Sequence, residues 1–364
     1  MELYGQATTL PPMPDPLAPG HLSFLTNDGD LIYCGDRPDS IEFDSTPCLL
    51  LRPSLEPQEC EAGVVESLQG HRTGASVVTL AAVGTYVMGS IHPSSTEVML
   101  TGSYSWTTGP EMPMHFYYGC ATPISRHQFL AFGHGSFGTT VREFDARGDG
   151  GLSPAGWKPI ATWPPLPKQR QGHVCSTIGR KVVIVGGDLT EGGLESAFTS
   201  TDILDLDSKL VRTGGILQTP RQFFQLVTVG EGAGQRLLAF GGGQNCSVGN
   251  SVWNLLSASM LHCETSLSSV EEWSLARGTW QTQELMMDTP RSFFSSVAIP
   301  PSLQCHGDLP TIPHGAVDCP DTRGVGTTCT VTCTTDLYQL ERNTSSTVVC
   351  GWGSAWVTRA RCGE

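Results

Sequence analysis

Charge is scarce in this sequence, and basic charge is scarcer still. Only 15% of the 364 residues are charged, and only 4 of the 21 basic residues are lysine. The net charge is −14 and no cluster of Lys and Arg occurs, so no basic surface could replace the counterions around nucleic-acid phosphates. No apolar run approaches the roughly 20 residues that a membrane helix needs. We therefore expect no nucleic-acid partner and no membrane span.

Glycine, proline and cysteine are abundant instead, with 42 Gly, 25 Pro and 13 Cys. Six cysteines lie in the last 60 residues, a density typical of a small disulfide-stabilised module in an oxidising compartment. Asn245 and Asn343 begin Asn-x-Ser sequons, the acceptor sites for glycosylation in secreted proteins. We expect a secreted protein or the ectodomain of a larger one. The first residues lack a basic-then-apolar leader, which favours an incomplete N-terminus.

A four-strand unit recurs from residue 21 onward, at intervals of about 45 to 70 residues. The units open with a His or Arg before β-branched or aromatic residues, at His21, His71, His115, Arg170, Arg221 and Arg291. Apolar second strands that reach glycine are predicted at 30–36, 85–90, 128–134, 181–187 and 236–243. Third strands are predicted at 41–44, 97–100, 141–145, 202–207 and 270–274, and fourth strands ending in proline at 106–113, 157–167, 210–220 and 280–290. Four short strands per period predict one propeller blade per repeat.

This pattern resembles the kelch repeat through its glycines. The double glycine of that repeat is present at Gly186-Gly187 and Gly241-Gly242, and one of the two glycines is kept at Gly35, Gly89 and Gly133. A strand that runs into a turn with positive φ favours glycine there. The resemblance implies an all-β protein whose residues 1–301 form a kelch-type β-propeller of five or six blades, in the galactose-oxidase-like superfamily.

The number of blades stays open at this point. Five units are complete, and a sixth opens at Arg291 and stops at Pro301. Residues 2–14 are predicted to contain a fourth strand, so 291–299 and 2–10 could form the two ends of a composite blade whose middle strands are missing. Such closure would remove free sheet edges. The alternative is a five-bladed ring in which 291–299 completes the first blade.

Seven cysteines fall within the propeller, and two local pairs are predicted. Cys246 and Cys263 lie in an insertion, residues 243–269, and their bond would close an 18-residue loop, stabilising it by roughly 3 kcal/mol. In the first blade, Cys48–Cys60 is the predicted bond. Cys34, Cys120 and Cys175 are left over, so at least one of them is expected to be unpaired.

The C-terminal residues 302–364 have the appearance of a second module. Their cysteines, glycines and Trp356 resemble a sushi (complement control protein) module. The resemblance implies the bonds Cys305–Cys350 and Cys333–Cys362, and the six-cysteine variety adds Cys319–Cys329. Leu337 and Ala360 depart from the family pattern, which usually has glycine and proline at these two positions. A module this small has little core, which explains its need for disulfides.

Nothing in the sequence predicts a catalytic site, and we expect neither a cofactor nor a metal. Copper radical oxidases similar to galactose oxidase share the kelch-type propeller and need a Cys cross-linked to a Tyr. Tyr33-Cys34 and Tyr118-Gly-Cys120 are the nearest candidates, but adjacent residues on a strand point to opposite faces. A secreted oxidase is therefore kept only as an alternative, and an intracellular kelch scaffold is another.

The favoured hypothesis is a non-catalytic extracellular protein that binds a protein or glycan for adhesion or recognition. Arg170, Arg221 and Arg291 open successive repeats. In kelch-like rings such positions can face the central channel or its rim, where arginines would suit an acidic peptide or an anionic glycan. The alternative is that each arginine pairs with a carboxylate of its own blade.

Overall fold

A computed structural model describes the chain over most of its first 295 residues and parts of the remainder. The described residues are 21–27, 30–35, 45–53, 60–69, 72, 74–89, 95–113, 116, 118–133, 139–147, 156–159, 162–187, 198–230, 232–247, 262–295, 309, 311–312, 315–319, 328–333, 339–340, 347–350, 356–358 and 362–363. The elements are β-strands, with a short 3-10 turn, η3, at Gly232–Gly234. No helix in the described parts is long and apolar enough to cross a membrane.

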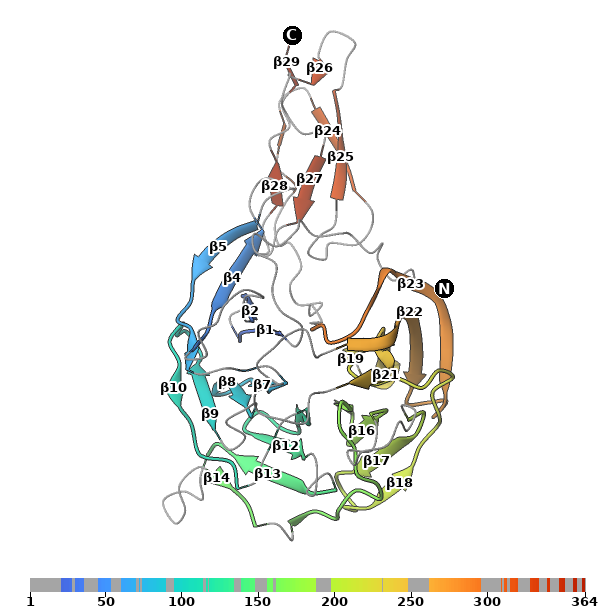
Figure 1. The fold of residues 1–364 in the computed structure, drawn as a ribbon. Helices are drawn as coiled ribbons and strands as arrows, with labels where there is room; N and C mark the ends of the chain where they lie inside the picture. The colour runs from blue at the N-terminus through green and yellow to red at the C-terminus, as the bar shows by residue number, and fades with distance from the viewer. Residues whose placement is uncertain are drawn as a thin grey trace.

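Five antiparallel sheets form a β-propeller (Figure 1). The first blade contains β1 (Leu22–Leu25), β2 (Leu31–Cys34), β4 (Cys48–Pro53) and β5 (Cys60–Val64), and the second β7 (Ser76–Leu80), β8 (Gly84–Met88), β9 (Thr96–Leu100) and β10 (Thr107–Thr108). The third contains β11 (Cys120–Pro123), β12 (Gln128–Phe132), β13 (Val141–Asp145) and β14 (Gly156–Trp157), and the fourth β15 (Val174–Ile178), β16 (Lys181–Val185), β17 (Thr201–Asp205) and β18 (Val211–Thr213). The fifth contains β19 (Gln225–Val229), β20 (Arg236–Phe240), β21 (Gly243–Ser247), β22 (His262–Ser274) and β23 (Trp280–Arg291). A two-stranded pair, β3 (Ser45–Thr46) with β6 (Leu68–Gln69), flanks the first blade.

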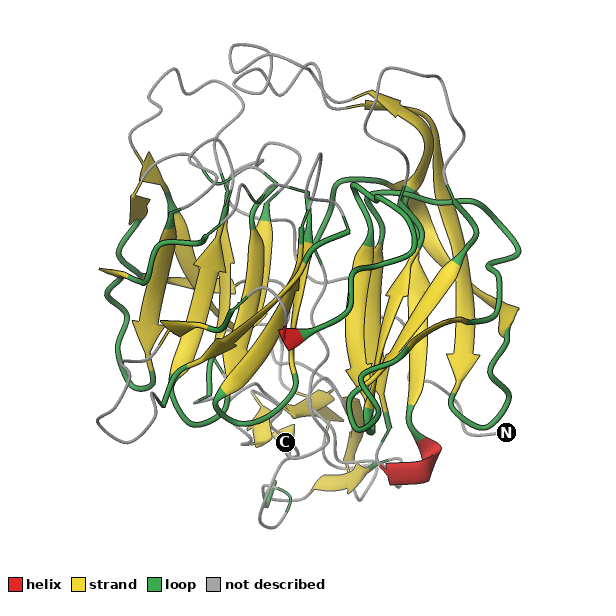
Figure 2. Cartoon of the chain, turned by 90° about the horizontal axis from the view of Figure 1, so that it is seen from below, coloured by secondary structure: helices red, strands yellow, loops and turns green. Residues whose placement is uncertain are grey.

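The innermost strands of successive blades contact one another, from β1 through β7, β11 and β15 to β19. Figure 2, viewed across the ring, shows the strands running from one face of the ring to the other. The second strand of a blade packs on both sides, which is why β8, β12 and β16 are nearly continuous buried runs. Each blade from the second to the fourth therefore packs against a neighbour on each face.

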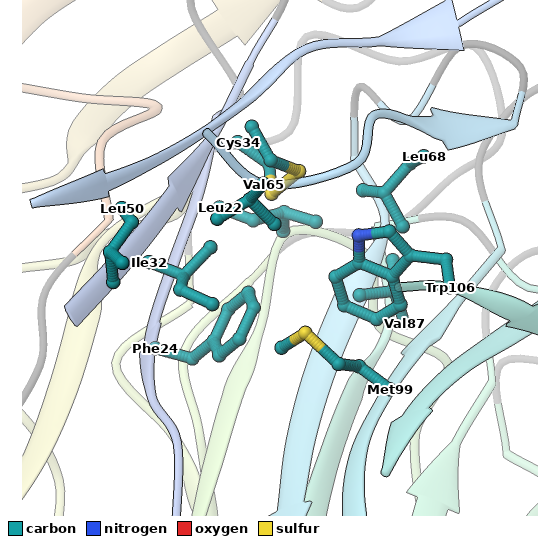
Figure 3. Packing of buried hydrophobic residues seen from close by; sticks show 11 residues of the cluster. Leu22, Phe24, Ile32, Cys34, Leu50, Val65, Leu68, Val87, Met99 and Trp106 are labelled. Atoms are coloured by element: carbon teal, nitrogen blue, oxygen red, sulfur yellow. A yellow bond between two sulfur atoms is a disulfide. The ribbon is translucent and has the colours of Figure 1, made fainter. Parts of the chain in front are cut away.

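The core consists of apolar layers between successive blades. Figure 3 shows the layer between the first and second blades, where Phe24 and Ile32 face Met99 and Trp106. Phe24 meets Trp106 edge-on, with ring centroids 6.0 Å apart. This layering follows directly from strands whose two faces are both apolar.

One strand prediction in the first blade is wrong. Residues 41–44 were expected to be its third strand, but the third strand of the sheet is β4, which pairs with β2. The segment that contains β4 is a more continuous apolar run, Cys-Leu-Leu-Leu, and such a run suits a strand covered on both faces. Residues 36–44 lie outside the described residues.

The ring brings the end of the fifth blade next to the first blade. The backbone N–H of Ser295 donates to His21 Nε2 at 3.2 Å. The structure therefore has five blades, and the unit that opens at Arg291 lies beside the first one. Residues 1–20 and 296–299, which the predicted composite blade would need, lie outside the described residues.

Two predictions about the disulfides of the propeller are wrong. Cys34 bonds to Cys48, so the predicted Cys48–Cys60 bond is wrong. Cys120 bonds to Cys175, so none of Cys34, Cys120 and Cys175 is unpaired, although at least one was expected to be. Cys34 and Cys48 are directly opposite each other in the register of β2 and β4, so their Cβ atoms lie close enough for a disulfide. The spacing of the cysteines in the sequence does not reveal this register. Cys120 and Cys175 join the innermost strands of the third and fourth blades.

The C-terminal residues form a separate sheet of four strands outside the ring (Figure 1). Its strands are β24 (Gly315–Asp318), β25 (Thr328–Cys333), β27 (Thr347–Cys350) and β28 (Trp356–Thr358), and β26 (Gln339–Leu340) pairs with β29 (Cys362–Gly363). Its apolar core contains Ile312, Val331 and Val348.

The tail also contains disulfides. Cys319 bonds to Cys329, and Cys333 is disulfide-bonded as well. Cys305 lies outside the described residues, as do the side chains of Cys350 and Cys362. The predicted pairs Cys305–Cys350 and Cys333–Cys362 and the boundary between residues 301 and 302 stay predictions.

Candidate functional site

A belt of backbone hydrogen bonds surrounds one end of the propeller axis. One residue is in the left-handed conformation, with φ between 49° and 73°, two residues before each innermost strand from the second blade to the fifth and at the matching position of the unit that opens at Arg291: Gly74, Tyr118, Gly172, Phe223 and Phe293. The N–H of each residue donates to the carbonyl of the one before it, at 2.8 Å, 2.9 Å, 2.9 Å and 3.1 Å in turn. The belt therefore joins successive blades at the point where each one begins.

Three aromatic members of this belt pack together at this end of the propeller. Tyr118, Phe223 and Phe293 are each less than 9% exposed and form one cluster, here called the axial plug. Phe293 stacks on Phe223 with ring centroids 4.1 Å apart, and Tyr118 meets Phe223 edge-on at 5.2 Å. Left-handed φ costs a non-glycine residue about 1–2 kcal/mol, so the packing of these rings must offset that cost.

The glycines of the belt leave room for the plug. A Cβ atom on Gly74 would lie 2.5 Å from the Tyr118 ring, and one on Gly172 would lie 2.8 Å from the Phe223 ring. Glycine and aromatic residues therefore divide the positions of the belt, because the Tyr118 and Phe223 rings each cover the glycine of the preceding blade. These residues all lie in the repeat openings of the sequence. The sequence does not show that they occupy one equivalent position, because some of them are glycine and the others are aromatic.

A disulfide-closed hairpin packs against the plug. β21 pairs with the first half of β22, and Cys246 bonds to Cys263 directly across this pair, as the sequence predicts. Both cysteines contact the plug cluster. A bridge between Gln222 and Gly243 ties the base of the hairpin to the belt. The hairpin therefore belongs to the plugged end of the axis and is more than a surface insertion.

The described part of the hairpin presents polar side chains to solvent. Asn245, the first predicted glycosylation site, is exposed, and its Nδ2 donates to Glu264 Oε2 at 2.9 Å. Glu264 and Thr265 are exposed as well. The second predicted glycosylation site, Asn343, lies outside the described residues.

Arg170 and Arg221 are structural, and the prediction that they offer a binding site is wrong. Each is 0% exposed. Arg170 donates to the Gly186 carbonyl at 2.6 Å and forms an ion pair with Asp202 at 2.9 Å. Arg221 pairs with Glu271 at 2.7 Å. The blade carboxylate is therefore the partner, as the alternative prediction had it.

A third arginine repeats this arrangement, and sequence reasoning did not single it out. Arg72 pairs with Glu97 and donates to the Gly89 carbonyl at 2.8 Å. The three arginines each lie four residues before an innermost strand, and each also contacts a serine (Ser95, Ser200 or Ser269). Each of these three repeats therefore contains an Arg, a Gly, a Ser and an acidic residue that contact one another. Comparing the repeat openings with the third strands in the sequence would have revealed this shared set.

Burial sets the electrostatics of these pairs. Burial lowers the pKa of Arg221, and the charge of Glu271 opposes that shift. Arg291 is exposed, unlike the three buried arginines at the same repeat position. In the third blade Phe116 occupies the arginine position, and Arg142 stands where the other blades have an acidic residue.

The innermost strands line the axis with hydroxyl groups. Thr122 and Thr177 are 3.1 Å apart across the third and fourth blades, and Ser176 lies 2.6 Å from Thr228 across the fourth and fifth. Thr79 donates to the Leu25 carbonyl between the first two blades. These groups are used in bonds between blades, so they hold the ring together.

The cysteines that resembled a copper radical site are used in disulfides. Cys34 and Cys120 both have sulfur partners, so neither sulfur is available for a bond to a tyrosine ring. Burial raises the pKa of Tyr33, and the Arg291 charge opposes that shift. Within the described ranges, no three His, Cys, Asp or Glu side chains are grouped so that they could hold a metal ion.

No protein-family model matches the chain, and no curated protein matches it significantly. The propeller fold, the disulfides and the plugged axis are what the structure itself provides. The kelch and sushi resemblances stay predictions.

Proposed function

We propose that this chain is an extracellular recognition protein that binds a protein or glycan ligand, without catalysis, at the plugged end of its propeller. The observation that carries the proposal is the disulfide-closed hairpin over the axial plug. A hairpin that extends a blade presents a binding surface, and functional loops on a rigid scaffold are the common arrangement for recognition. The plug packs against both cysteines of the hairpin and so supports it.

The disulfides support an extracellular location. Four bonds are present in the described residues, and such bonds persist in oxidising compartments and are rare in the cytosol. A secreted glycoprotein or an ectodomain fits this chemistry, with Asn245 as an exposed candidate for glycosylation. The intracellular scaffold is the weaker hypothesis because reduction would remove all four bonds.

The glycine geometry supports a kelch-type propeller. Gly186 and Gly187 both have positive φ, at 64° and 84°, and Gly241 and Gly242 have 56° and 92°. A Cβ atom at any of the four would lie within 3 Å of a neighbouring atom. The first glycine of each pair lies against the next unit and the second against the start of its own blade, so both the turn and the close packing favour glycine. For the tail, the Cys319–Cys329 bond supports a sushi-type module.

The test is a binding screen with the full chain. The labelled protein is applied to an array of extracellular proteins and glycans, and every positive is measured again in solution. We expect Glu264→Lys, on the hairpin, to weaken binding at least about tenfold, the change that corresponds to roughly 1.4 kcal/mol. Glu284→Lys is the matched control, because Glu284 is exposed on β23 outside the described hairpin.

Two outcomes would overturn the proposal. One is equal weakening by the two charge reversals, which would remove the hairpin from the interface. The other is release of hydrogen peroxide from simple alcohols by the copper-loaded chain, which would favour the secreted oxidase.

A further inference from the structure

A cavity of about 250 Å³ lies at the seam between the fourth and fifth blades. From the fourth blade it is lined by Lys181, Ile203, Arg212 and the loop that follows β18. From the fifth blade it is lined by Trp273 and the turn between β22 and β23. Figure 1 shows these two blades as neighbours in the ring. The cavity is separate from the axial plug and from the hairpin.

The register of the fourth blade directs two cations toward this seam. Ile203 is opposite both Val183 and Arg212, so these three side chains share a face, and Lys181 lies two residues from Val183 on that face. Ile203 and Val183 belong to the apolar layer between the two blades. Lys181 and Arg212 therefore stand at the edge of that layer, where the apolar contacts end and the cavity begins.

Neither cation is neutralised by a close ion pair. Among the described residues, no carboxylate lies within ion-pair distance of Lys181 or Arg212. Asp205 is opposite Lys181 in the register and interacts with it electrostatically, but its carboxylate accepts hydrogen bonds from Ser208 and from the Asp207 N–H. Arg212 is exposed, so its guanidinium can reach a ligand from solvent.

The wall from the fifth blade contains a buried indole. Trp273 is 1% exposed, and its Nε1 is buried as well. The Trp273 ring therefore closes the inner side of the cavity, and its resonances can report on a group bound there.

Glycines form the rest of the lining, so no side chain fills the cavity there. A Cβ atom on Gly215 would lie 2.7 Å from the Gly278 carbonyl, so the two backbones touch at the cavity. Gly278 has a φ of 67° and open space where a side chain would be. The lining therefore offers two cations, with no carboxylate among the side chains that form it.

We propose that this cavity binds a compact oxyanion, a sulfate or a carboxylate, either free or carried by a sugar ring. The two cations suit an acceptor-only ligand, because Arg and Lys form their strongest hydrogen bonds with ionised oxygens. The volume suits a group no larger than a single sugar. The chain as a whole is strongly acidic, with a net charge of −14, so anion binding here needs a local site. This inference does not rest on the proposed function.

The test is a titration of the full chain, labelled with ¹⁵N at its tryptophan indoles, with potassium sulfate at constant ionic strength. The Nε1–H resonance of Trp273, assigned with Trp273→Phe, should shift and saturate. Arg212→Ala and Lys181→Met should each raise the sulfate Kd about tenfold. Arg180→Ala is the matched control, because Arg180 is an exposed arginine of the same blade that pairs with Asp207 and does not line the cavity.

A parallel titration distinguishes the two sources of the oxyanion. Tighter binding of galactose 6-sulfate than of sulfate, with no response to galactose, would identify a sulfated sugar. Equal or weaker binding would identify the free oxyanion. Absence of a saturable shift at the Trp273 indole with either sulfated probe would overturn the proposal. So would equal weakening by Arg180→Ala and Arg212→Ala, since that would reflect general charge alone. Arg212 is exposed, so its variant tests the site even if Trp273→Phe fails to fold.

Discussion

At the scale of single residues, the blades are held by a repeated buried ion pair. Arg72, Arg170 and Arg221 each hold a carboxylate of the third strand and a carbonyl of the glycine turn. Removing one partner of such a pair is more damaging than the pair is stabilising, because an uncompensated charge stays buried. The arginines that were predicted to bind a ligand thus stabilise the glycine turn and the third strand of their own blades.

We predict that Arg221→Ala lowers the free energy of unfolding by about 3–5 kcal/mol, since Glu271 would be left buried and unpaired. Urea unfolding followed by tryptophan fluorescence measures the loss. Arg291→Ala is the matched control, because Arg291 opens the next unit with the same Arg-x-Phe-Phe sequence but is exposed. That control should change stability by no more than about 0.5 kcal/mol. Similar losses in the two variants would refute the structural role given to Arg221.

Asp145 is predicted to make stability depend on pH in the acid range. A side-chain hydrogen bond from Arg147 holds its pKa at about 2, below the ordinary 3.8, and Gln128 donates to it as well. Because the folded pKa is depressed, this stabilisation is present above pH 3.8 and is lost as the pH falls toward 2. Asp145→Asn should therefore be less stable than the parent chain at neutral pH.

The deficit of Asp145→Asn should shrink between pH 4 and pH 2, as measured by urea midpoints across that range. Asp205→Asn gives a comparison from the fourth blade, where an exposed carboxylate accepts hydrogen bonds from Ser208. A deficit for Asp145→Asn that stays constant with pH would contradict the assignment.

At the scale of elements, the hairpin of β21 and β22 is the feature on which the proposed ligand binding depends. It continues β20 beyond the Gly241-Gly242 turn, and β23 pairs with the other half of β22. The hairpin is thus anchored at its base by the fifth blade, and its two cysteines pack against the axial plug. Its rigidity depends on the disulfide.

We predict that replacing Cys246 and Cys263 together by serine lowers the free energy of unfolding by roughly 3 kcal/mol, the entropy estimate for an 18-residue loop. Ligand binding at the hairpin should weaken as well, because the paired strands lose their closure. Replacing Cys120 and Cys175 by serine is the control, since that bond joins two innermost strands away from the hairpin. That control should lower stability and leave binding by the folded protein unchanged. Loss of binding in the control alone would contradict the role of the hairpin.

At the scale of the whole molecule, the sequence predicts the periodic parts of the fold well. The apolar run from Lys181 to Gly187 predicts both β16 and the turn after it, because a strand covered on both faces and a positive-φ turn each require particular residue types. The pairing of Cys34 with Cys48 was not predictable in the same way. It depends on which residues of β2 and β4 are opposite, and register is a property of the assembled sheet.

The candidate site was less predictable than the fold. Phe223 and Phe293 occupy left-handed positions that usually favour glycine, so no residue preference marks them. The carboxylate partners of the buried arginines lie 25 to 50 residues further along the chain, and only the closed blade brings them together. The cavity at the seam of two blades likewise contains residues from separate repeats.

The central claim is that this propeller works in oxidising surroundings outside the cell, and the state of its cysteines tests that claim most directly. The protein is isolated from its native source, alkylated before any reduction, digested and mapped by mass spectrometry. We predict linked peptides for Cys34–Cys48, Cys120–Cys175, Cys246–Cys263 and Cys319–Cys329. Recovery of these eight cysteines as alkylated free thiols would contradict the claim and place the protein in a reducing compartment.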